Sequence, residues 1–575
     1  MASHDYVINN GTGSAVRQDL NNALQAIATN NSGSSTPGTT YASQFYANTS
    51  GSIMQLRNTG NSGYVNLFSL AGGPAFTAGG TIEGMNIGLG TNSISGNTAI
   101  GINALDASVS GGNNTCLGHS TLTTLTSGSQ NVAIGSFVLD LTTTGNNNTG
   151  CGFNALTDLT TGVNNSSFGS GSLTEISTGD NNCSFGVASQ ANNNGDQNCG
   201  FGNSTLNQNT TGDQNSAFGL NALFNNTTAN ANCAFGVNAL FTNTTGVQNS
   251  AFGAFSLDAS STANNCSAFG HASLTSVTTG SSCTGIGAFA LQNTTTGLQN
   301  TAVGHTALAI NTTGQNNNAF GMQALFNNTT ALQNNAFGTN ALFTNSTGQN
   351  NNAFGYQSLY SNTTASNNVA IGTNALFTNT TGSSNTACGF GALFSCTTGA
   401  TNTAVGLNAL NILTTGVRCT AIGEEAGDLN TTGNDNIFLG HNAQASTATV
   451  NGECVLGDSG IATLRCNSQT ILGLSDKRDK TDIESIPVGL SFIDKLNPVK
   501  FKWQTRDGNR KDGTYEAGFI AQDLQQVQQD ASADFLHLVL AENPDKLEAS
   551  YGRLVPVLVK AVQELSAKVT ALEAG

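Results

Sequence analysis

The chain has 575 residues, of which 9% are charged and 38% are hydrophobic, and its formal net charge at pH 7 is −16. Glycine, asparagine, threonine and serine dominate, which is not typical of an enzyme, and 29 phenylalanines supply more apolar surface than a disordered chain carries. Nucleic acid and anionic membranes attract clustered lysine and arginine, so the acidic balance argues against both as partners.

Basic residues concentrate near one end of the chain. Thirteen of the 17 lysines and arginines follow Ser475, whereas residues 101–440 contain only Arg418, so two chemically different regions share the chain. The sequence has no 18-residue apolar run to span a membrane, and its N-terminus lacks the basic and apolar segments of a secretory signal. We therefore expect a protein that stays in the cytosol where it is made, with its 12 cysteines as free thiols and without a cofactor.

Residues 1–72 have a mixed composition that predicts a small separate module. Residues 5–9 resemble a strand, Ser14 is a candidate helix cap, and short strands are expected at Ile53–Arg57 and Tyr64–Phe68. The predicted helix carries an apolar stripe, formed by Val16, Leu20, Leu24 and Ile27.

The first 32 residues, MASHDYVINNGTGSAVRQDLNNALQAIATNNS, resemble the N-terminal attachment module of fibre proteins from phages that infect marine cyanobacteria. The resemblance implies that this module anchors the protein to phage tail or baseplate proteins. The alternative is a simple cap for the region that follows. Residues 73–100 are expected to form the transition to that region.

A glycine recurs every 17 residues from Gly101 to Gly440, with one step of 16 between Gly186 and Gly202. The 21 units read approximately N-x-A-(F/I/V)-G-x-x-A-L-F-x-x-T-T-G-x-x. Seventeen residues are too few for two packed helices, whereas short β-favouring pieces between Gly, Asn and Thr corners fit one coil of a parallel β-solenoid. We predict such a solenoid from about residue 84 to 445, with domain limits at 101 and 445 and an irregular coil at the 16-residue step.

Alternation within a coil places Phe320, Phe337 and Phe354 on one strand face and small residues on the other. We expect the large side chains to fill the coil interior, and the small Ala/Gly face to let three solenoids pack into one trunk. The TTG corner is expected to turn left-handed at its glycine, and the recurring asparagines to form hydrogen-bonded ladders.

The repeats resemble the left-handed β-roll of trimeric adhesin heads, whose units carry similar N-x-(A/V)-(I/F)-G pieces. The resemblance implies a homotrimer of mainly β structure. It leaves the function open, because such heads serve both bacterial adhesins and viral fibres.

Four histidines directly follow an anchor glycine and occupy equivalent places on the coil: His119, His271, His305 and His441. In a trimer, three copies of one histidine would be able to hold a metal at the axis. The same place also accepts Phe153, Leu220 and Met322, so we interpret it as a tolerant position and assign no metal. The cysteines form no CxxC pair that would indicate zinc.

Carboxylates are sparse in the repeat region. A glycan-cleaving enzyme needs a pair of them, yet the only glutamates between residues 101 and 440 are Glu175, Glu424 and Glu425, and the aspartates are dispersed. A polysaccharide-degrading tailspike is therefore a distant alternative.

Residues 446–474 are expected to form closing strands, and at Ser475 the composition becomes mixed and charged. Four segments after this point resemble, in the same order, the intramolecular chaperone domain of the peptidase S74 family: SDKRDKTDI (475–483), LNPVKFKWQ (496–504), AGFIAQDLQQV (517–527) and YGRLVPVLVKAVQEL (551–565). The resemblance implies that residues 475–575 are an α+β chaperone that cleaves itself from the fibre once. It also implies a cut at the Leu474–Ser475 bond, with Ser475 as nucleophile and Lys480 as general base.

The chemistry of a serine–lysine dyad sets conditions on this segment. Lysine acts as a base only when burial or nearby positive charge lowers its pKa well below ~10.4, and Lys477 and Arg478 are candidates for that charge. Residues five apart on an α-helix point about 140° apart. Either the segment is irregular, or Lys480 of a neighbouring chain approaches Ser475. The alternative is that Ser475 is a helix N-cap and Lys480 an exposed lysine.

The last apolar pattern has a 4-3-4-3 spacing, at Leu558, Val562, Leu565, Val569 and Leu572. It predicts a short coiled-coil seam. Two heptads are marginal alone, so we expect the seam to help trimerisation within the chaperone.

Together these features predict a homotrimeric phage tail fibre for host-surface attachment, located in the virion and, during assembly, in the host cytoplasm. Its expected partners are tail or baseplate proteins and a host receptor, either a glycan or an envelope protein. A slip of three chains by one coil would leave nearly identical contacts, so a removable C-terminal trimeriser would set the register, and its loss would give kinetic stability to residues 1–474. A cell-surface trimeric adhesin is the main rival, and it would need an export signal and a C-terminal β-barrel anchor.

Overall fold

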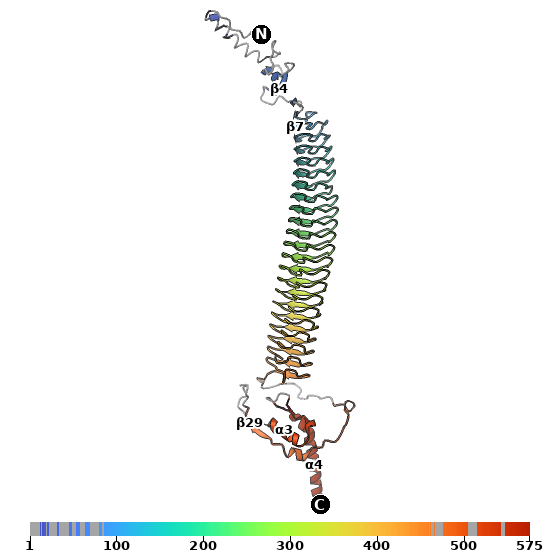
Figure 1. Cartoon of the computed structure of the whole chain (residues 1–575), viewed down its shortest axis with the longest axis vertical. Helices are drawn as coiled ribbons and strands as arrows, with labels where there is room; N and C mark the ends of the chain where they lie inside the picture. Colours follow the sequence, from blue (N-terminus) through green and yellow to red (C-terminus); the bar gives the residue numbers. More distant parts are fainter. Residues whose placement is uncertain are drawn as a thin grey trace. The chain divides into compact units, whose positions relative to one another are not determined.

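The computed structural model describes residues 85–458, 460–461, 465, 475–503, 515–541 and 547–575. Before residue 85 it describes residues 12, 14–15, 17–18, 20–21, 32–33, 45–48, 53–57, 64–69 and 80–82. The chain divides into two compact units, Met1–Gln315 and Asn316–Gly575, and each is described by itself (Figure 1).

The first unit begins with a four-stranded sheet in the order β1 (Ser32–Gly33), β2 (Phe45–Asn48), β3 (Ile53–Arg57), β4 (Tyr64–Ser69). β1 and β2 are parallel, and the other neighbours are antiparallel. The two predicted strands at 53–57 and 64–68 are confirmed, and residues 15, 17, 18, 20 and 21 are helical as expected. Ser14, the candidate cap, is itself helical. The strand predicted at residues 5–9 lies outside the described residues, as do Val16, Leu24 and Ile27.

The solenoid of the first unit starts with a hairpin of β5 (Gly80–Ile82) and β6 (Met85–Gly88), which pairs antiparallel with β7 (Thr98–Ile102). From β7 onward each three-residue strand pairs in parallel with the strand of the next coil. These strands are β8 (Thr115–Leu117), β9 (Val132–Ile134), β10 (Thr149–Cys151), β11 (Ser166–Phe168), β12 (Cys183–Phe185), β13 (Cys199–Phe201), β14 (Ser216–Phe218), β15 (Cys233–Phe235), β16 (Ser250–Phe252), β17 (Ser267–Phe269), β18 (Thr284–Ile286) and β19 (Thr301–Val303).

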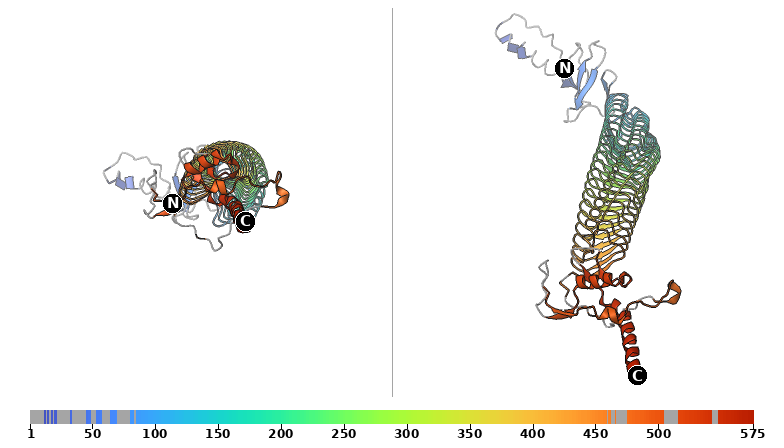
Figure 2. Two further views of the ribbon diagram at one scale, coloured as in Figure 1. Left: turned by 90° about the horizontal axis from the view of Figure 1, so that it is seen from below. Right: turned by 60° about the horizontal axis from the view of Figure 1, so that its bottom comes forward.

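The second unit has the same pattern of parallel three-residue strands, so the predicted parallel β-solenoid is confirmed (Figure 2). Its last strand pairs in parallel with the strand before it and adds a coil beyond residue 445. The strands are β20 (Asn318–Phe320), β21 (Asn335–Phe337), β22 (Asn352–Phe354), β23 (Val369–Ile371), β24 (Thr386–Cys388), β25 (Thr403–Val405), β26 (Thr420–Ile422), β27 (Ile437–Leu439) and β28 (Cys454–Leu456).

The 16-residue coil between Gly186 and Gly202 keeps its strands in register, because Cys183 pairs with Cys199 and Phe185 with Phe201. The missing residue comes from the corner, where the two residues 194–195 replace the usual Thr-Thr-Gly. The predicted irregularity is therefore confirmed and is confined to a loop.

The predicted orientation of the strand side chains is wrong. The middle residue of each strand faces the interior, so Ala217, Ala234 and Ala251 are 0% exposed, whereas the phenylalanines that follow them are only partly covered. The reason is the width of the coil. At Gly285, a middle position, an added Cβ would lie 2.5 Å from the Ser273 side chain and 3.2 Å from a Leu274 side-chain carbon, so a phenylalanine does not fit inside a regular coil.

Alanine and leucine from the turn after the strand complete the interior, as with the buried pair Ala222 and Leu223. Leu223 has a left-handed backbone at φ 53°, which costs a residue with a Cβ about 1–2 kcal/mol and is offset by burying the leucine side chain. The expected left-handed glycine of the TTG corner is also wrong: the left-handed residue is the second one after it, for example Gln248 at φ 59°. The anchor glycines do require glycine, because at Gly236 (φ 140°) a Cβ would lie 2.5 Å from the carbonyl oxygen of Gly253.

The predicted asparagine ladder is confirmed and lies inside the coils. The Asn232 backbone N–H donates to Asn215 Oδ1 (3.0 Å), and Asn232 Nδ2 donates to the carbonyl of Gly246 (2.9 Å). The Asn232 Oδ1 in turn accepts from the backbone N–H of Asn249 (2.9 Å). Each buried asparagine thus satisfies backbone groups of its neighbours and connects one coil to the next.

The C-terminal region is a small α+β fold built around α2 (Leu490–Ile493), α3 (Ala521–Asp530) and α4 (Val555–Ala574). Two short antiparallel pairs join them, β29 (Val499–Phe501) with β30 (Glu516–Gly518) and β31 (Val539–Leu540) with β32 (Glu548–Ala549). The 3₁₀ turns are η1 (Lys477–Asp479), η2 (Asp534–Leu536) and η3 (Tyr551–Leu554). The hydrophobic core of this C-terminal region consists of Phe492, Ala533, Leu536, Leu538, Leu554 and Val557. Among the described residues, no helix is long and apolar enough to cross a membrane.

One coil near the end of the solenoid exchanges a small for a large interior residue. β27 carries Phe438, which is fully buried, where most other strands carry alanine or another small residue. On the facing turn Gly427 stands where most coils have leucine, and a Cβ there would lie 2.6 Å from the Phe438 ring. The phenylalanine therefore occupies the volume that the missing leucine leaves.

We predict that Phe438→Ala destabilises the surrounding coils by about 3–5 kcal/mol, because it opens a cavity that no neighbour fills. Since coils interact only with adjacent coils, the loss should be local and visible as faster hydrogen–deuterium exchange in residues 423–457. The double variant Gly427→Leu/Phe438→Ala restores the interior of a regular coil and should recover most of the protection. Equal hydrogen–deuterium exchange in the single and double variants would contradict the interpretation that Phe438 fills the volume of the missing leucine.

Candidate functional site

The two residues predicted to form a dyad lie together at the start of the C-terminal region. Lys480 Nζ donates a hydrogen bond to Ser475 Oγ at 2.5 Å. The residues between them form η1, a single 3₁₀ turn, which is followed by an extended backbone at Lys480 (φ −127°, ψ 134°). The segment is thus irregular, and of the two geometries considered from the sequence it adopts the one within a single chain.

Asp476 closes this turn. Its carboxylate accepts from the backbone N–H of Arg478 (2.9 Å) and from that residue's guanidinium Nη2 (2.6 Å). These bonds lower the pKa of Asp476 and raise the pKa of Arg478. Arg478 forms an ion pair with Asp476 on the surface of this turn.

Ser475, Lys480 and the turn between them are exposed to solvent. A serine–lysine pair needs a desolvated lysine to work as a general base. The geometry brings the side chains predicted to act as nucleophile and base into contact, and in one chain both are open to solvent. Leu474, on the other side of the predicted cleavage bond, lies outside the described residues.

Helix α4 turns one face into the C-terminal core and the other to solvent. Val557 and Ala561 are buried, whereas the predicted seam residues are 45–81% exposed: Leu558, Val562, Leu565, Val569 and Leu572. At the start of the seam, an apolar groove is lined by Ile493, Leu496, Pro498, Phe519, Tyr551 and Leu558. A single chain therefore presents the seam without covering it.

The four histidines that follow anchor glycines are exposed on the outside of the coils. His119 packs edge-on against Phe137 (5.1 Å between ring centres), His271 packs likewise against Phe289 (5.2 Å), and His441 Nδ1 lies 3.6 Å from Asp458. Within the described part of the chain, no three His, Cys, Asp or Glu side chains gather to hold a metal.

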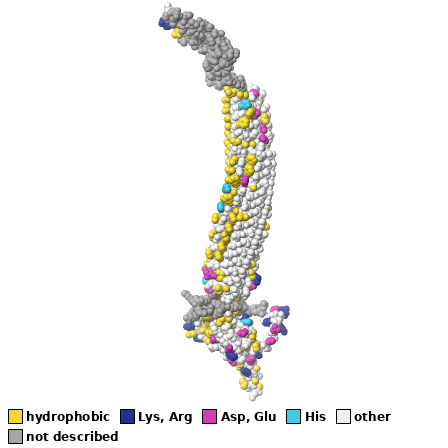
Figure 3. Space-filling view, in the orientation of Figure 1, with side chains coloured by type: hydrophobic (Ala, Val, Ile, Leu, Met, Phe, Trp, Pro, Cys, Tyr) yellow, Lys and Arg dark blue, Asp and Glu magenta, His cyan; other side chains and the backbone are white. Residues whose placement is uncertain are grey.

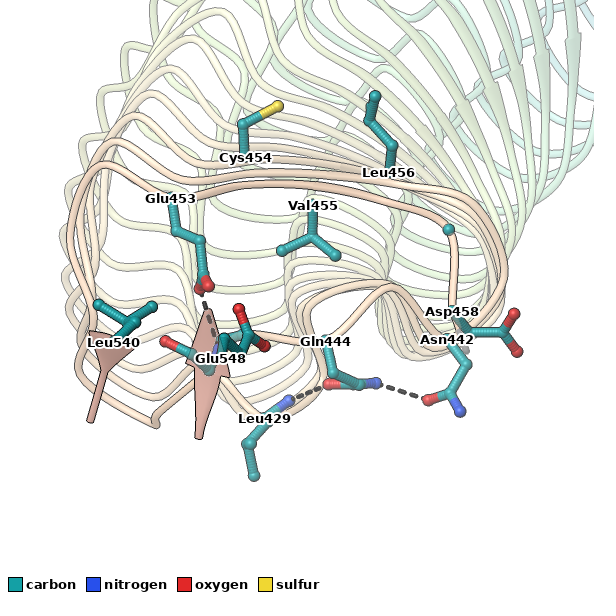
Figure 4. Close-up of a pocket in the computed structure, with 13 residues that line it drawn as sticks. Leu429, Asn442, Gln444, Glu453, Cys454, Val455, Leu456, Asp458, Leu540 and Glu548 are labelled. Atoms are coloured by element: carbon teal, nitrogen blue, oxygen red, sulfur yellow. Dashed lines mark hydrogen bonds between the residues drawn. The ribbon is translucent and has the colours of Figure 1, made fainter. Parts of the chain in front are cut away.

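Polar side chains of the last coils form hydrogen bonds with the backbone of neighbouring turns. Glu453 accepts from the backbone N–H of Ser446 (2.9 Å), and Gln444 links the backbone of Leu429 to the side chain of Asn442 (Figure 4). Burial raises the pKa of Asp428, and the nearby charge of Glu425 adds to this. Glu453 and Gln444 thus connect the turns of the last coils.

Comparison with known protein families gives one informative match at the C-terminus. Residues 475–532 match the Peptidase S74 family, the chaperone of endosialidase. The matched segment begins at Ser475 and implies an autoproteolytic chaperone domain. Together with the β-solenoid, it fits a protein of the phage tail-fibre or tailspike type. Comparisons with curated proteins and with solved structures gave no match.

Sequence reasoning placed Ser475 and Lys480 but missed Asp476. A signal was present, since an aspartate that precedes a turn commonly accepts the N–H two residues on, as Asp476 does with Arg478. Asp476 thus caps the η1 turn that lies between Ser475 and Lys480.

We predict that Asp476→Ala opens the η1 turn and speeds hydrogen–deuterium exchange in residues 475–482 of the full chain. Because its pKa is lowered, the Asp476 carboxylate keeps the turn capped above the ordinary carboxyl range, and the cap is lost as pH falls through the lowered value. The control Asp479→Ala changes the same net charge without removing the cap. Equal exchange in both variants would argue against a role for Asp476.

Proposed function

We propose that the chain is the subunit of a homotrimeric phage tail fibre whose C-terminal S74 region assembles the trimer and then cleaves itself off. The observation that carries the proposal is the contact of Lys480 Nζ with Ser475 Oγ at 2.5 Å. It lies at the first residue of the S74 match, next to the solenoid in the sequence. The exposed seam of α4 supports the trimer, because it offers a coiled-coil contact that one chain cannot complete.

The proposed cleavage uses only groups of this chain and water. Ser475 Oγ attacks the carbonyl carbon of Leu474 while Lys480 accepts the hydroxyl proton. The peptide C–N bond then breaks, and the Ser475 nitrogen leaves as an amine after taking up a proton. Water hydrolyses the resulting ester to a carboxylate at residue 474, and the products are residues 1–474 and 475–575.

Assembly gives a reason for the cleavage to wait. Ser475 and Lys480 are exposed in one chain, so the desolvation that a lysine base needs has to come from neighbouring chains. Cleavage then follows only correct association. In the fibre, residues 1–72 would attach to tail or baseplate proteins, and the solenoid would reach toward a receptor on the host surface, either a glycan or an envelope protein.

Ser475→Ala removes the nucleophile, so we expect the full 58.5 kDa chain to persist. Lys480→Ala removes the base and should slow cleavage by at least about 100-fold. The control Lys477→Ala lies on the same turn and should cleave like the wild type. Mass spectrometry of the purified proteins reads the outcome directly. A 1–474 fragment from Ser475→Ala would remove the catalytic assignment and leave the chaperone role standing.

The second expectation concerns the mass of the assembly. Light scattering of the cleaved wild-type fibre should give three times the mass of residues 1–474, because one thin solenoid leaves apolar surface exposed along its length. A monomer or dimer mass would contradict the trimer whether or not cleavage occurs.

A further inference from the structure

The outside of the solenoid carries an apolar stripe made of two columns. The first is the third residue of each strand, and it is hydrophobic in every coil from Ile100 to Val303 and from Phe320 to Leu456. The second is the residue after the anchor glycine, which is often large and apolar, as at Phe153, Val187, Leu220, Met322, Tyr356 and Phe390. Figure 3 shows hydrophobic side chains gathered along one side of the coils.

The first column is regular on the scale of single rings. From Phe168 to Phe269 successive phenylalanine rings stack with centres 4.4–4.9 Å apart and planes within 4–7° of parallel. The second unit repeats this from Phe320 to Phe354 at 4.6–4.8 Å. The stripe is thus a ridge whose period equals the rise of one coil.

The stripe is larger than a soluble monomer normally exposes. Its more open members are 36–54% exposed, which for large side chains of ~150–250 Å² each leaves on the order of 80 Å² bare per residue. Summed over the coils of even one unit, this exceeds the few hundred Å² usual for the largest apolar patch of a monomer and reaches the range of obligate interfaces.

We propose that this stripe is the contact surface between copies of the chain, which lie parallel and in register along the solenoid. The number of copies, three, rests on the proposed function; the surface does not. A second copy is the occupant that fits, because a partner must present apolar groups at the same period over many coils, and the chain itself has that period. The proposed contact between chains is therefore formed by the strand face that carries the large apolar residues. From the sequence, the face with the small Ala and Gly residues was expected to form it.

The stripe also accounts for the exposed histidines. His119, His271 and His305 occupy the second column and pack edge-on against phenylalanines of adjacent coils. Their rings extend the apolar ridge where the sequence lacks an aliphatic residue.

The test introduces charge on one face at a time. The triple variant Phe218→Glu, Phe235→Glu, Phe252→Glu places three carboxylates on the stripe. The matched control Thr211→Glu, Thr228→Glu, Thr245→Glu places them on the exposed corner of neighbouring coils. We expect light scattering and urea titration to show a dissociated or far less resistant assembly for the first variant and a wild-type assembly for the second.

Cross-linking keeps the test decisive if the charged variant does not fold. The photoreactive residue p-benzoyl-phenylalanine in place of Leu220, on the stripe, should join chains into covalent dimers and trimers, whereas in place of Thr228 it should not. Mapping by mass spectrometry should find the joined residues in the same coil of each chain, and a 17-residue offset would indicate slipped copies.

The outcomes separate the two proposals. If the Phe→Glu variant forms a trimer as stable as that of the wild type, or if cross-links form from position 228 alone, the stripe is not the interface. The proposed fibre function would then still stand. A wild-type monomer would overturn both. Capture of lipid vesicles of phosphatidylcholine by a monomeric chain would identify the stripe as a membrane-binding surface instead. Loss of cleavage with an intact, stripe-dependent trimer would overturn only the catalytic part of the proposed function.

Discussion

The structure depends on how a 17-residue coil satisfies its own backbone. So short a coil has room inside for little besides small aliphatic residues, leucine and asparagine, and the asparagines supply the hydrogen bonds that turns leave open. Asn249 shows the pattern: it donates to the carbonyl of Ala263 (2.7 Å) and accepts from the next backbone N–H (2.9 Å). Unpaired, each of those buried backbone groups would cost about 1–3 kcal/mol. Where the chain replaces the asparagine with Cys266, the thiol donates to the equivalent carbonyl of Gly280 (3.3 Å), so the requirement for a donor persists when the residue changes.

The narrow interior also determines what the outside must be. Phenylalanine and isoleucine have the β propensity that a three-residue strand needs, but in the strands of the regular coils they lie at outward-facing positions. One coil shows the same limit on interior volume. Phe438 is buried inside it, and there Gly427 stands in place of the leucine that most coils have. A solenoid of this width therefore produces an apolar stripe along its surface, and association with other copies is the natural way to cover it.

Much of this could be predicted from the sequence, since a 17-residue glycine spacing and β-favouring pieces define a solenoid, its ladders and its one short coil. The direction of the strand side chains could not. Alternation separates two faces but does not say which face is inside, and that depends on the coil's width, which is a property of the packed structure. The family resemblance implied that Ser475 and Lys480 act together but left open whether both belong to one chain. The turn that brings them together within one chain is capped by Asp476, which bonds to Arg478, and helical geometry does not anticipate this local bond.

Regularity has a different effect within one chain and between chains. Inside the chain, covalent connection places each coil on its predecessor, and the polar interior near the short coil marks a unique position, where Ser189 contacts Thr205 (2.7 Å) and Asn193 bonds to Gln190 (2.9 Å). Between chains, the stripe is nearly the same from one coil to the next, as the stacked phenylalanines of β11 to β17 show. A copy displaced by one coil would lose little contact energy, so there would be little driving force to restore the correct register after the chains had associated. The register of the proposed trimer therefore has to be set at one end, by a domain whose sequence does not repeat. The S74 region has a sequence that does not repeat. After its proposed removal, the three chains would keep the register that it had set during assembly.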